Sequence, residues 1–215
     1  MEFKKYSIDK FIEDLSSALP SPGGGSVAAL IAALSGSLNS MVYSLTVNKK
    51  SFECLDGESK KIVLDFKEAS TRFINRAMVL MEKDRECFNK LMDCYKLSKE
   101  TEEEKEKRNK AIMTNTVMAM RAPQELANEC YKFYDNIEVA VKYGNKMLIS
   151  DAGCSAILLH SAIECAIVNV KVNLNALRNK PFSKGIEDEI LFLEEQSLKR
   201  KNKICLEMNK IIYPQ

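Results

Sequence analysis

Three consecutive glycines, Gly23, Gly24 and Gly25, precede Ser26 and a long uncharged segment. Glycine loses more conformational entropy on folding than any other residue, so this run is expected where the backbone turns sharply or passes close to another group. At the start of a helix, its N–H groups would favour an anionic ligand such as a carboxylate or a phosphate. A tight turn packed against a neighbouring helix would use the same residues, and both interpretations are equally supported. Neither a Walker loop nor a Rossmann glycine motif fits the spacing.

Five further polar residues are candidates for the same site. Asp84 lies in LMEKDRECF, where its charged neighbours favour a solvated helix face. Asn169 and Asn173 are four residues apart on a largely apolar helix, so their amides need partners, in a neighbouring helix or in a ligand. Lys49 and Lys50 follow the uncharged segment, where cations suit a helix C-terminus and could also receive an anionic ligand.

Asp151 follows Ser150 at an expected helix start, where its most probable role by residue type is an N-cap. His160 is the single histidine and is expected in the core. The 7 cysteines include no pair at Cys-x-x-Cys spacing, so we expect no metal site. They are expected to act as small apolar residues in a reducing compartment, and the charged, amphipathic N-terminus is not a secretory signal. These features predict a cytoplasmic protein.

Composition limits the classes of partner. The 215 residues are 46% hydrophobic and 29% charged, with a net charge of +2. This balance does not require nucleic acid or an anionic membrane as a partner. The absence of tryptophan also argues against an aromatic platform for single-stranded nucleic acid.

The periodicity of apolar residues predicts helices along almost the whole chain and no strand. The first expected helix covers residues 8–15 with Ser7 as its cap, the second covers 27–47 with Ser26 as its cap, and the third covers 59–95 after a break at Gly57. A Thr101–Glu104 capping box begins the next helix, Pro123 is expected to kink or split it, and it is expected to stop at Tyr143 with Gly144 as its cap. Two more helices are expected, one over 151–177 and a last one that ends at about Ile212. The predicted fold is all-α: a single domain over residues 1–215 of long packed antiparallel helices, a helical bundle.

The segment from Leu15 to Asn48 has no charged side chain and is long enough to span a membrane. Serine, glycine and asparagine interrupt it, no aromatic belt flanks it, and the other helices are strongly amphipathic. A central helix buried on all sides is therefore favoured over a membrane span. Its small residues, from Ala28 to Ser40, would let another helix approach closely, in the bundle or at a homodimer interface.

The sequence PSPGGGSVAALIAALSGSLNSMVYSLT, residues 20–46, resembles the signature of the formiminotransferase-cyclodeaminase family, in its cyclodeaminase domain. The family pattern is Pro-x-Pro-Gly-Gly-Gly-Ser, then a small-residue helix ending in Leu-Thr and a basic pair, here Lys49 and Lys50. EKDRECFNKLMDCYKLSKETEEEKEKR resembles the Asp-x-x-x-Phe helix and restart. GNKMLISDAGCSA and NVKVNL resemble two further segments, so the likeness covers nearly the whole chain. Ser98 departs from an expected proline, which alters a turn.

This resemblance implies an all-helical homodimer that acts on one-carbon-loaded tetrahydrofolate. The implied reaction cyclises 5-formimidoyltetrahydrofolate to 5,10-methenyltetrahydrofolate and releases ammonia, with no redox cofactor or metal. By the spacing to Phe88, the catalytic aspartate of the family corresponds to Asp84, which replaces the solvated-face interpretation with that of a general acid/base.

The remaining site residues are assigned from their chemistry. Gly23, Gly24, Gly25 and Ser26 are expected to form a wall of the pterin or carboxylate pocket. Asp151, Asn169 and Asn173 are expected to hydrogen-bond the pterin ring, and Lys49 and Lys50 to hold the glutamate tail.

Three alternatives are open at this point. Methenyltetrahydrofolate cyclohydrolase activity on the same fold would open the same ring with water. A non-catalytic helical dimer that binds folate or acts as a scaffold is the second, although the retained Asp84 counts against it. A membrane-associated helical protein is the third.

Overall fold

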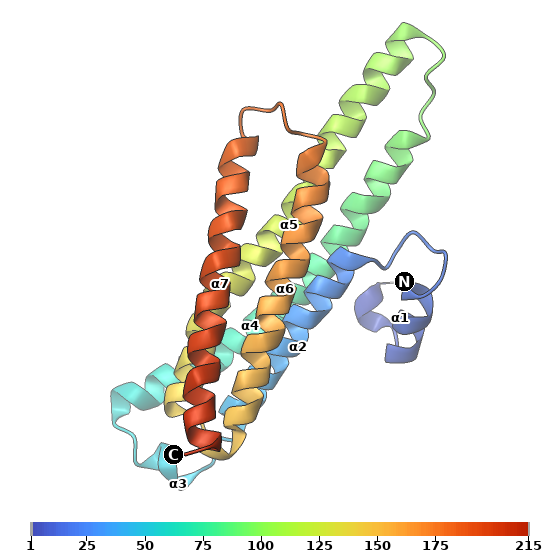
Figure 1. The fold of residues 1–215 in the computed structure, drawn as a ribbon. Helices are drawn as coiled ribbons and strands as arrows, with labels where there is room; N and C mark the ends of the chain where they lie inside the picture. Colours follow the sequence, from blue (N-terminus) through green and yellow to red (C-terminus); the bar gives the residue numbers. More distant parts are fainter. Residues whose placement is uncertain (1, 215) are drawn as a thin grey trace.

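The structure is a computed structural model that describes residues 2–214 (Figure 1). These residues form seven α-helices, two short 3-10 helices and no strand. In chain order the elements are η1 (Phe3–Lys5), α1 (Ile8–Leu15), α2 (Gly24–Ser44), α3 (Lys50–Glu53), α4 (Gly57–Tyr95), α5 (Glu102–Tyr143), η2 (Lys146–Leu148), α6 (Ile149–Asn175) and α7 (Ser183–Ile212). The predicted all-helical class is confirmed.

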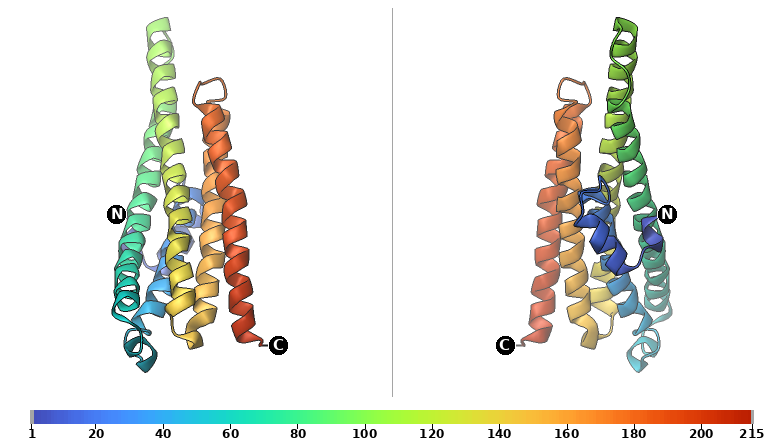
Figure 2. Two further views of the ribbon diagram at one scale, coloured as in Figure 1. Left: turned by 90° about the vertical axis from the view of Figure 1, so that its left-hand side faces the viewer. Right: turned by 90° about the vertical axis from the view of Figure 1, so that its right-hand side faces the viewer.

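The five long helices form one elongated bundle around α2 and α6 (Figures 1 and 2). Helix α2 packs against α4 and α6, α5 packs against α4 and α6, and α7 covers α6 and part of α5. The α4–α5 hairpin extends beyond the other helices at one end. Helix α1 lies beside the bundle, and the chain returns from it to the start of α2.

The small residues of α2 allow its neighbours to approach closely. Ala28, Ala29 and Ala32 are fully buried. A Cβ atom at Gly36 would lie 2.9 Å from side-chain carbons of Phe73 and Ile74 on α4, so the two helices pack against a bare backbone here. This contact confirms the close helix approach that the small-residue run predicts.

A buried polar cluster fixes the register of three helices. The Asn39 amide donates to Oδ1 of Asn136 at 2.7 Å, and the Asn136 amide donates to the Phe66 carbonyl at 2.9 Å. The Tyr43 hydroxyl donates to the backbone carbonyl of Asn136 at 2.7 Å. Sliding one of these helices would leave buried polar groups without partners, which costs about 1–3 kcal/mol for each group.

Several predicted helix ends are confirmed. The Ser7 side chain caps α1, and Thr101 and Glu104 form the predicted capping box of α5. The N–H of Gly144 closes the end of α5 on the Ala140 carbonyl. Each depends on residues within about four positions, which is why sequence alone predicts them.

Other predicted ends are wrong. Ser26 does not cap α2, because Gly23 is the N-cap and the helix begins at Gly24. Asp151 lies in the first turn of α6 and not at its cap, because η2 leads directly into a helix that begins at Ile149. Pro123 does not split α5, since its ring replaces one backbone donor within a helix of 42 residues that packs along much of its length.

Two helices, Gly24–Ser44 and the stretch Lys146–Asn175, are long and apolar enough to cross a membrane by length and composition. In the structure, both lie at the centre of the bundle and pack against each other. Their polar residues are used inside it, as in the Ser35 hydroxyl that donates to the Ser155 carbonyl at 2.8 Å.

Candidate functional site

A small pocket of about 110 Å³ lies where the glycine turn meets the middle of α4 and the end of α6. It brings together residues from four helices that are far apart in the sequence. Its lining comprises Pro20, Ser21, Gly23, Gly24, Gly25, Ser26, Asp84, Arg85, Phe88, Ala119, Asn169 and Asn173. Seven of the ten predicted site residues therefore share one pocket: the glycine turn with Ser26, Asp84, and both asparagines.

Asp84 lies directly against the glycine turn. A Cβ atom built on Gly25 would overlap the Asp84 carboxyl group, so this aspartate reaches its position only because residue 25 has no side chain. The Ser26 hydroxyl donates to Oδ2 of Asp84 at 3.5 Å, which is a long hydrogen bond. Hence the glycine run has a specific purpose in this fold: it admits a carboxyl group.

The acidity of Asp84 is unusual for an aspartate. Burial of the carboxyl group raises its pKa to about 6, and the hydrogen bond from Ser26 lowers it only in part. No cation offsets the burial strongly enough to keep the pKa in its usual range. Near neutral pH both the protonated and the ionised forms are populated, which suits a group that accepts and returns a proton.

Asn169 and Asn173 line the same pocket from the last turns of α6. A Cβ atom on Gly24 would be 3.2 Å from Nδ2 of Asn169, so this amide lies against the glycine turn. Each asparagine uses its NH₂ group within α6, donating to the carbonyl four residues earlier. Their Oδ1 atoms have no hydrogen-bond donor among the described residues, and can therefore accept from a ligand.

Arg85 and Phe88 also line this pocket, and the sequence analysis did not assign Arg85 to it. The Arg85 guanidinium lies 3.0 Å from Glu82 and stacks over the Phe3 ring, with 5.1 Å to its centroid. These contacts tie the segment before α1 to α4 next to Asp84. In the sequence, only its position next to Asp84 pointed to Arg85. Because both belong to a run of charged residues, this position did not distinguish Arg85 from its neighbours.

Lys49, Lys50 and Asp151 are not part of this pocket within one chain. Helix α2 begins at the pocket, and its 21 residues span about 30 Å before the chain reaches Lys49 and Lys50 at the start of α3. Asp151 belongs to the first turn of α6, whereas Asn169 and Asn173 lie near its end. At this opposite end the Thr46 hydroxyl accepts from the Asn145 N–H at 2.8 Å, which joins the end of α2 to the turn before α6.

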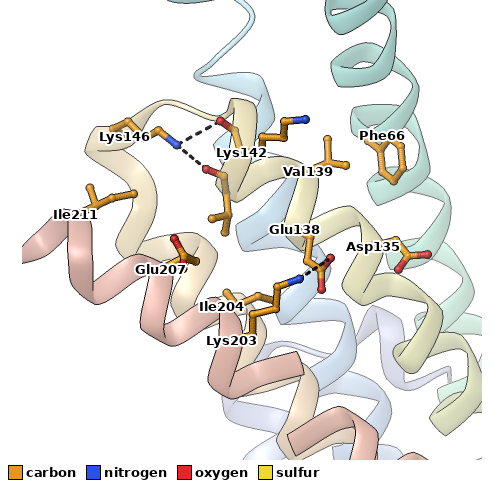
Figure 3. A pocket seen from close by; sticks show the side chains of 11 residues that line it. Phe66, Asp135, Glu138, Val139, Lys142, Lys146, Lys203, Ile204, Glu207 and Ile211 are labelled. Carbon is orange, nitrogen blue, oxygen red and sulfur yellow. Dashed lines mark hydrogen bonds and ion pairs between the residues drawn. The ribbon is translucent and has the colours of Figure 1, made fainter. Parts of the chain in front are cut away.

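The other grooves do not combine such groups. The groove between α5 and α7 has a volume of about 620 Å³ and is lined by several lysines and acids (Figure 3). Lys146 donates there to the carbonyls of Val141 and Lys142, and Lys203 lies 3.8 Å from Glu138. Its cations are thus already engaged by the protein.

A family model described as formiminotransferase-cyclodeaminase matches residues 7–191, which include every residue of the pocket. The chain belongs to the formiminotransferase-cyclodeaminase family. Known relatives within it have two kinds of name. A methenyltetrahydrofolate cyclohydrolase of Methylorubrum extorquens is 32% identical over 82% of this chain and 83% of its own length.

The formimidoyltransferase-cyclodeaminase of Rattus norvegicus is 28% identical over 89% of this chain, which spans about 35% of that longer protein. The crystal structure of a formiminotetrahydrofolate cyclodeaminase from Thermotoga maritima has the same fold, with a TM-score of 0.76. The likeness covers 97% of this chain and 96% of that one, at 23% sequence identity. Membership of the formiminotransferase-cyclodeaminase family thus rests on sequence, and the fold agrees with it.

Proposed function

We propose that this protein acts on one-carbon-loaded tetrahydrofolate, with Asp84 as the general acid/base. The observation that carries the proposal is the Asp84 carboxyl group, whose pKa is raised to about 6 beside the glycine turn. Relatives named as cyclodeaminases and as a cyclohydrolase support an enzyme of folate chemistry. Both reactions move one proton between atoms bonded to the one-carbon unit, and a single carboxyl group is sufficient for this.

In the cyclodeaminase reaction, N10 of the folate attacks the formimidoyl carbon, and a bond from this carbon to N10 forms. The formimidoyl group enters in its protonated amidinium form, so its nitrogen already carries two protons. Asp84 would take the proton from N10 and deliver it to this nitrogen as the third, and ammonia departs when its bond to carbon breaks, which leaves the positive charge on the methenyl bridge. The product is the 5,10-methenyl bridge. Proton transfer by a positioned side chain contributes about 10²–10⁴-fold to such a rate.

The cyclohydrolase reaction is the second candidate, because a relative that is 32% identical over 82% of this chain carries that name. Water would attack the methenyl carbon, and Asp84 would take a proton from this water. The same proton would pass to N5 as the carbon–N5 bond breaks, and the remaining hydroxyl proton would be released to solvent, which leaves 10-formyltetrahydrofolate. Asn169 and Asn173 would orient the pterin ring through their Oδ1 atoms in either reaction, and neither reaction requires a metal or a redox cofactor.

Absorbance of the methenyl chromophore separates these reactions. Enzyme-dependent appearance from 5-formimidoyltetrahydrofolate would establish the cyclodeaminase. Decay of 5,10-methenyltetrahydrofolate, without activity in the first assay, would establish the cyclohydrolase. No change in either assay, with folded protein, would reject both in favour of a folate-binding or scaffold role.

We further propose a homodimer formed through α2. Leu34, Met41 and Leu45 are partly exposed and lie seven and four residues apart, on one face of this helix. Helix α2 is uncharged, so two copies of this face would meet without charge repulsion. We expect the protein in the soluble fraction of a cell lysate, because the two apolar helices pack against each other within the bundle.

Light scattering of Leu34→Glu tests this interface, because a charge at a buried dimer contact should produce monomers. The matched control is Leu64→Glu on α4, since both leucines are 49% exposed. Equal effects of the two variants on the molecular mass would reject α2 as the interface. Within one chain Lys49, Lys50 and Asp151 lie far from the pocket, so only a second copy could bring them to it. Rejection of the α2 interface would therefore also remove this way for them to contact the folate.

A further inference from the structure

A groove of about 670 Å³ lies between the α4–α5 hairpin and the turn that joins α6 to α7. Tyr95, Met113 and Thr116 line it from the hairpin, and Arg178 and Lys180 line it from the turn. The helical bundle therefore holds a second cavity, about six times larger than the one beside Asp84.

This groove continues the Asp84 pocket along the same three helices. On α4, Phe88 lines the pocket and Tyr95, two turns farther, lines the groove. On α5, Ala119 and Thr116 are one turn apart. Residues three, four or seven apart share one helix face, so α4 and α5 each present one face to both cavities. On α6, Asn173 lines the pocket and Asn175, the last residue of the helix, lines the groove.

The charges along the groove are all positive. Its lining contains Arg178 and Lys180 and no carboxylate. Neither side chain has an ion pair or hydrogen bond within residues 2–214. Three other grooves of about 620, 590 and 520 Å³ each include at least one glutamate beside their cations. Arg178 also borders the groove of about 590 Å³, where Glu187 lies, although no ion pair joins these two side chains. In the groove of Figure 3, Lys203 is paired with Glu138, whereas Arg178 and Lys180 can reach an anionic ligand.

Tyr95 and Met113 supply apolar surface to the groove. The Tyr95 side chain is 49% exposed and Met113 is 41% exposed, although both lie between helices. An aromatic ring and a thioether form a suitable surface for a second, planar aromatic group. From Asp84 to Tyr95 the eleven residues of helix rise about 16 Å, so a ligand that used both cavities would be long.

The size of the Asp84 pocket requires such an extension. At about 110 Å³ it is well below the roughly 300–1,000 Å³ of sites that enclose a ligand of drug size. A folate consists of a pterin, an aminobenzoyl ring and one or more glutamates. The pocket has room for part of the pterin, and the rest of the molecule must lie outside it.

We propose that the groove binds the aminobenzoyl-glutamate end of the folate, with the ring against Tyr95 and Met113 and the carboxylates at Arg178 and Lys180. This inference rests on the proposed function, and it transfers the expected tail contact from Lys49 and Lys50 to the turn after α6. A chain of several glutamates carries more carboxylates and should bind more tightly than a single glutamate.

The test compares two double variants that remove two cations each. One is Arg178→Ala with Lys180→Ala. The control is Lys184→Ala with Lys199→Ala, two exposed lysines of α7 that pair only with Asp188 and Glu195 on their own helix. Dissociation constants for 5-formyltetrahydrofolate with one or several glutamates are measured by calorimetry, and KM and kcat by the methenyl absorbance.

We expect the Arg178/Lys180 variant to weaken binding of the monoglutamate about tenfold, and of the polyglutamate more, with kcat within about twofold of the wild type. A tetrahydropterin without the benzoyl-glutamate should bind both variants and the wild type equally. The control variant should match the wild type for all ligands.

Unchanged folate affinity in the Arg178/Lys180 variant would overturn this inference, as would an equal loss for the truncated pterin. A wild type that binds folate without turnover would reject the proposed reaction while leaving the groove to be judged by the dissociation constants. A wild type that binds no folate would overturn both.

Discussion

The two ends of α2 carry motif residues of the same family but use them differently. At its start, Gly25 has no side chain and the Asp84 carboxyl group occupies that space, half-buried, with a raised pKa. At its end, the Thr46 hydroxyl accepts from the Asn145 N–H, and the Asn145 side chain accepts from the Met147 N–H. The first arrangement leaves a titratable group facing a cavity, whereas the second satisfies backbone donors at a turn.

This difference shows two reasons why a polar residue belongs to the sequence signature of a family: one is functional and the other is structural. A carboxyl group whose pKa is raised by burial costs stability when it is ionised, and such a cost is typical of functional sites. A hydroxyl or amide that caps a backbone turn lowers the free energy of the folded chain and needs no ligand to account for it. The two ends should therefore respond in opposite ways to substitution.

Asp84→Asn should have the largest effect. Turnover should fall by about 10²–10⁴-fold, because the amide cannot carry the proton. The pKa of Asp84 is raised on folding, so its contribution to stability is lost as the pH rises from about 4 to about 6. At pH 7.5 the variant should therefore unfold with a free energy about 1–3 kcal/mol higher than the wild type, with little difference at pH 4.

Methenyl absorbance and denaturant unfolding at both pH values measure these changes. Asp65→Asn, at an exposed aspartate of the same helix, is the matched comparison and should change neither turnover nor stability by a similar amount. A fully active Asp84→Asn variant would falsify the assignment of Asp84.

Gly25→Ala should have the next largest effect. The added Cβ overlaps the Asp84 carboxyl group, so either the carboxyl group or the start of α2 must move. Displacement of a catalytic group by about 1 Å can cost about 10²-fold in rate. Gly57→Ala at the start of α4 is the control, because nothing lies within 4 Å of its Cβ position. Comparable kinetics of the two variants would mean that the glycine turn does not position Asp84.

Ser26→Ala should give a smaller change, visible in the pH profile. The reaction requires ionised Asp84 to accept a proton, so kcat/KM should decline below about pH 6. The Ser26 hydroxyl lowers the pKa of Asp84, and its removal should move this decline to higher pH. Ser37→Ala, whose hydroxyl bonds only the Ala33 carbonyl, should leave the profile in place. A profile that moves to lower pH in Ser26→Ala would contradict this electrostatic account.

Lys49→Ala combined with Lys50→Ala should have the smallest effect on catalysis. Both lysines are exposed at the end distant from Asp84, and we expect KM to change less than about threefold. Steady-state kinetics with mono- and polyglutamylated folate provide the measurement. A larger increase in KM would mean that both ends of α2 contribute to folate binding, and would indicate that a second copy brings its lysines to the pocket.

The sequence analysis identified most residues of the site, but it did not predict which of them lie close together. The role of Asp84 was assigned from the family resemblance, and those of Gly23–Ser26, Asn169 and Asn173 from their chemistry; all of them line one pocket. Lys49, Lys50 and Asp151 were assigned from their chemistry in the same way, and residue chemistry contains no information about distance. Arg178 and Lys180 were not noticed, because two cations in a turn are common and only the lining of the groove shows that no acid accompanies them.

The sequence by itself determined the features that depend on residues a few positions apart. These are the helical periodicity, the caps at Ser7 and Thr101, and the uncharged small-residue helix at the centre. Tertiary structure decided which aspartate lies against the glycine turn, which motif residues share a cavity, and which cations line the larger groove beside it. The physical reason is that burial and electrostatics depend on helices that meet across the bundle, and Gly25 and Asp84, 59 residues apart, interact only after folding has brought α2 against α4.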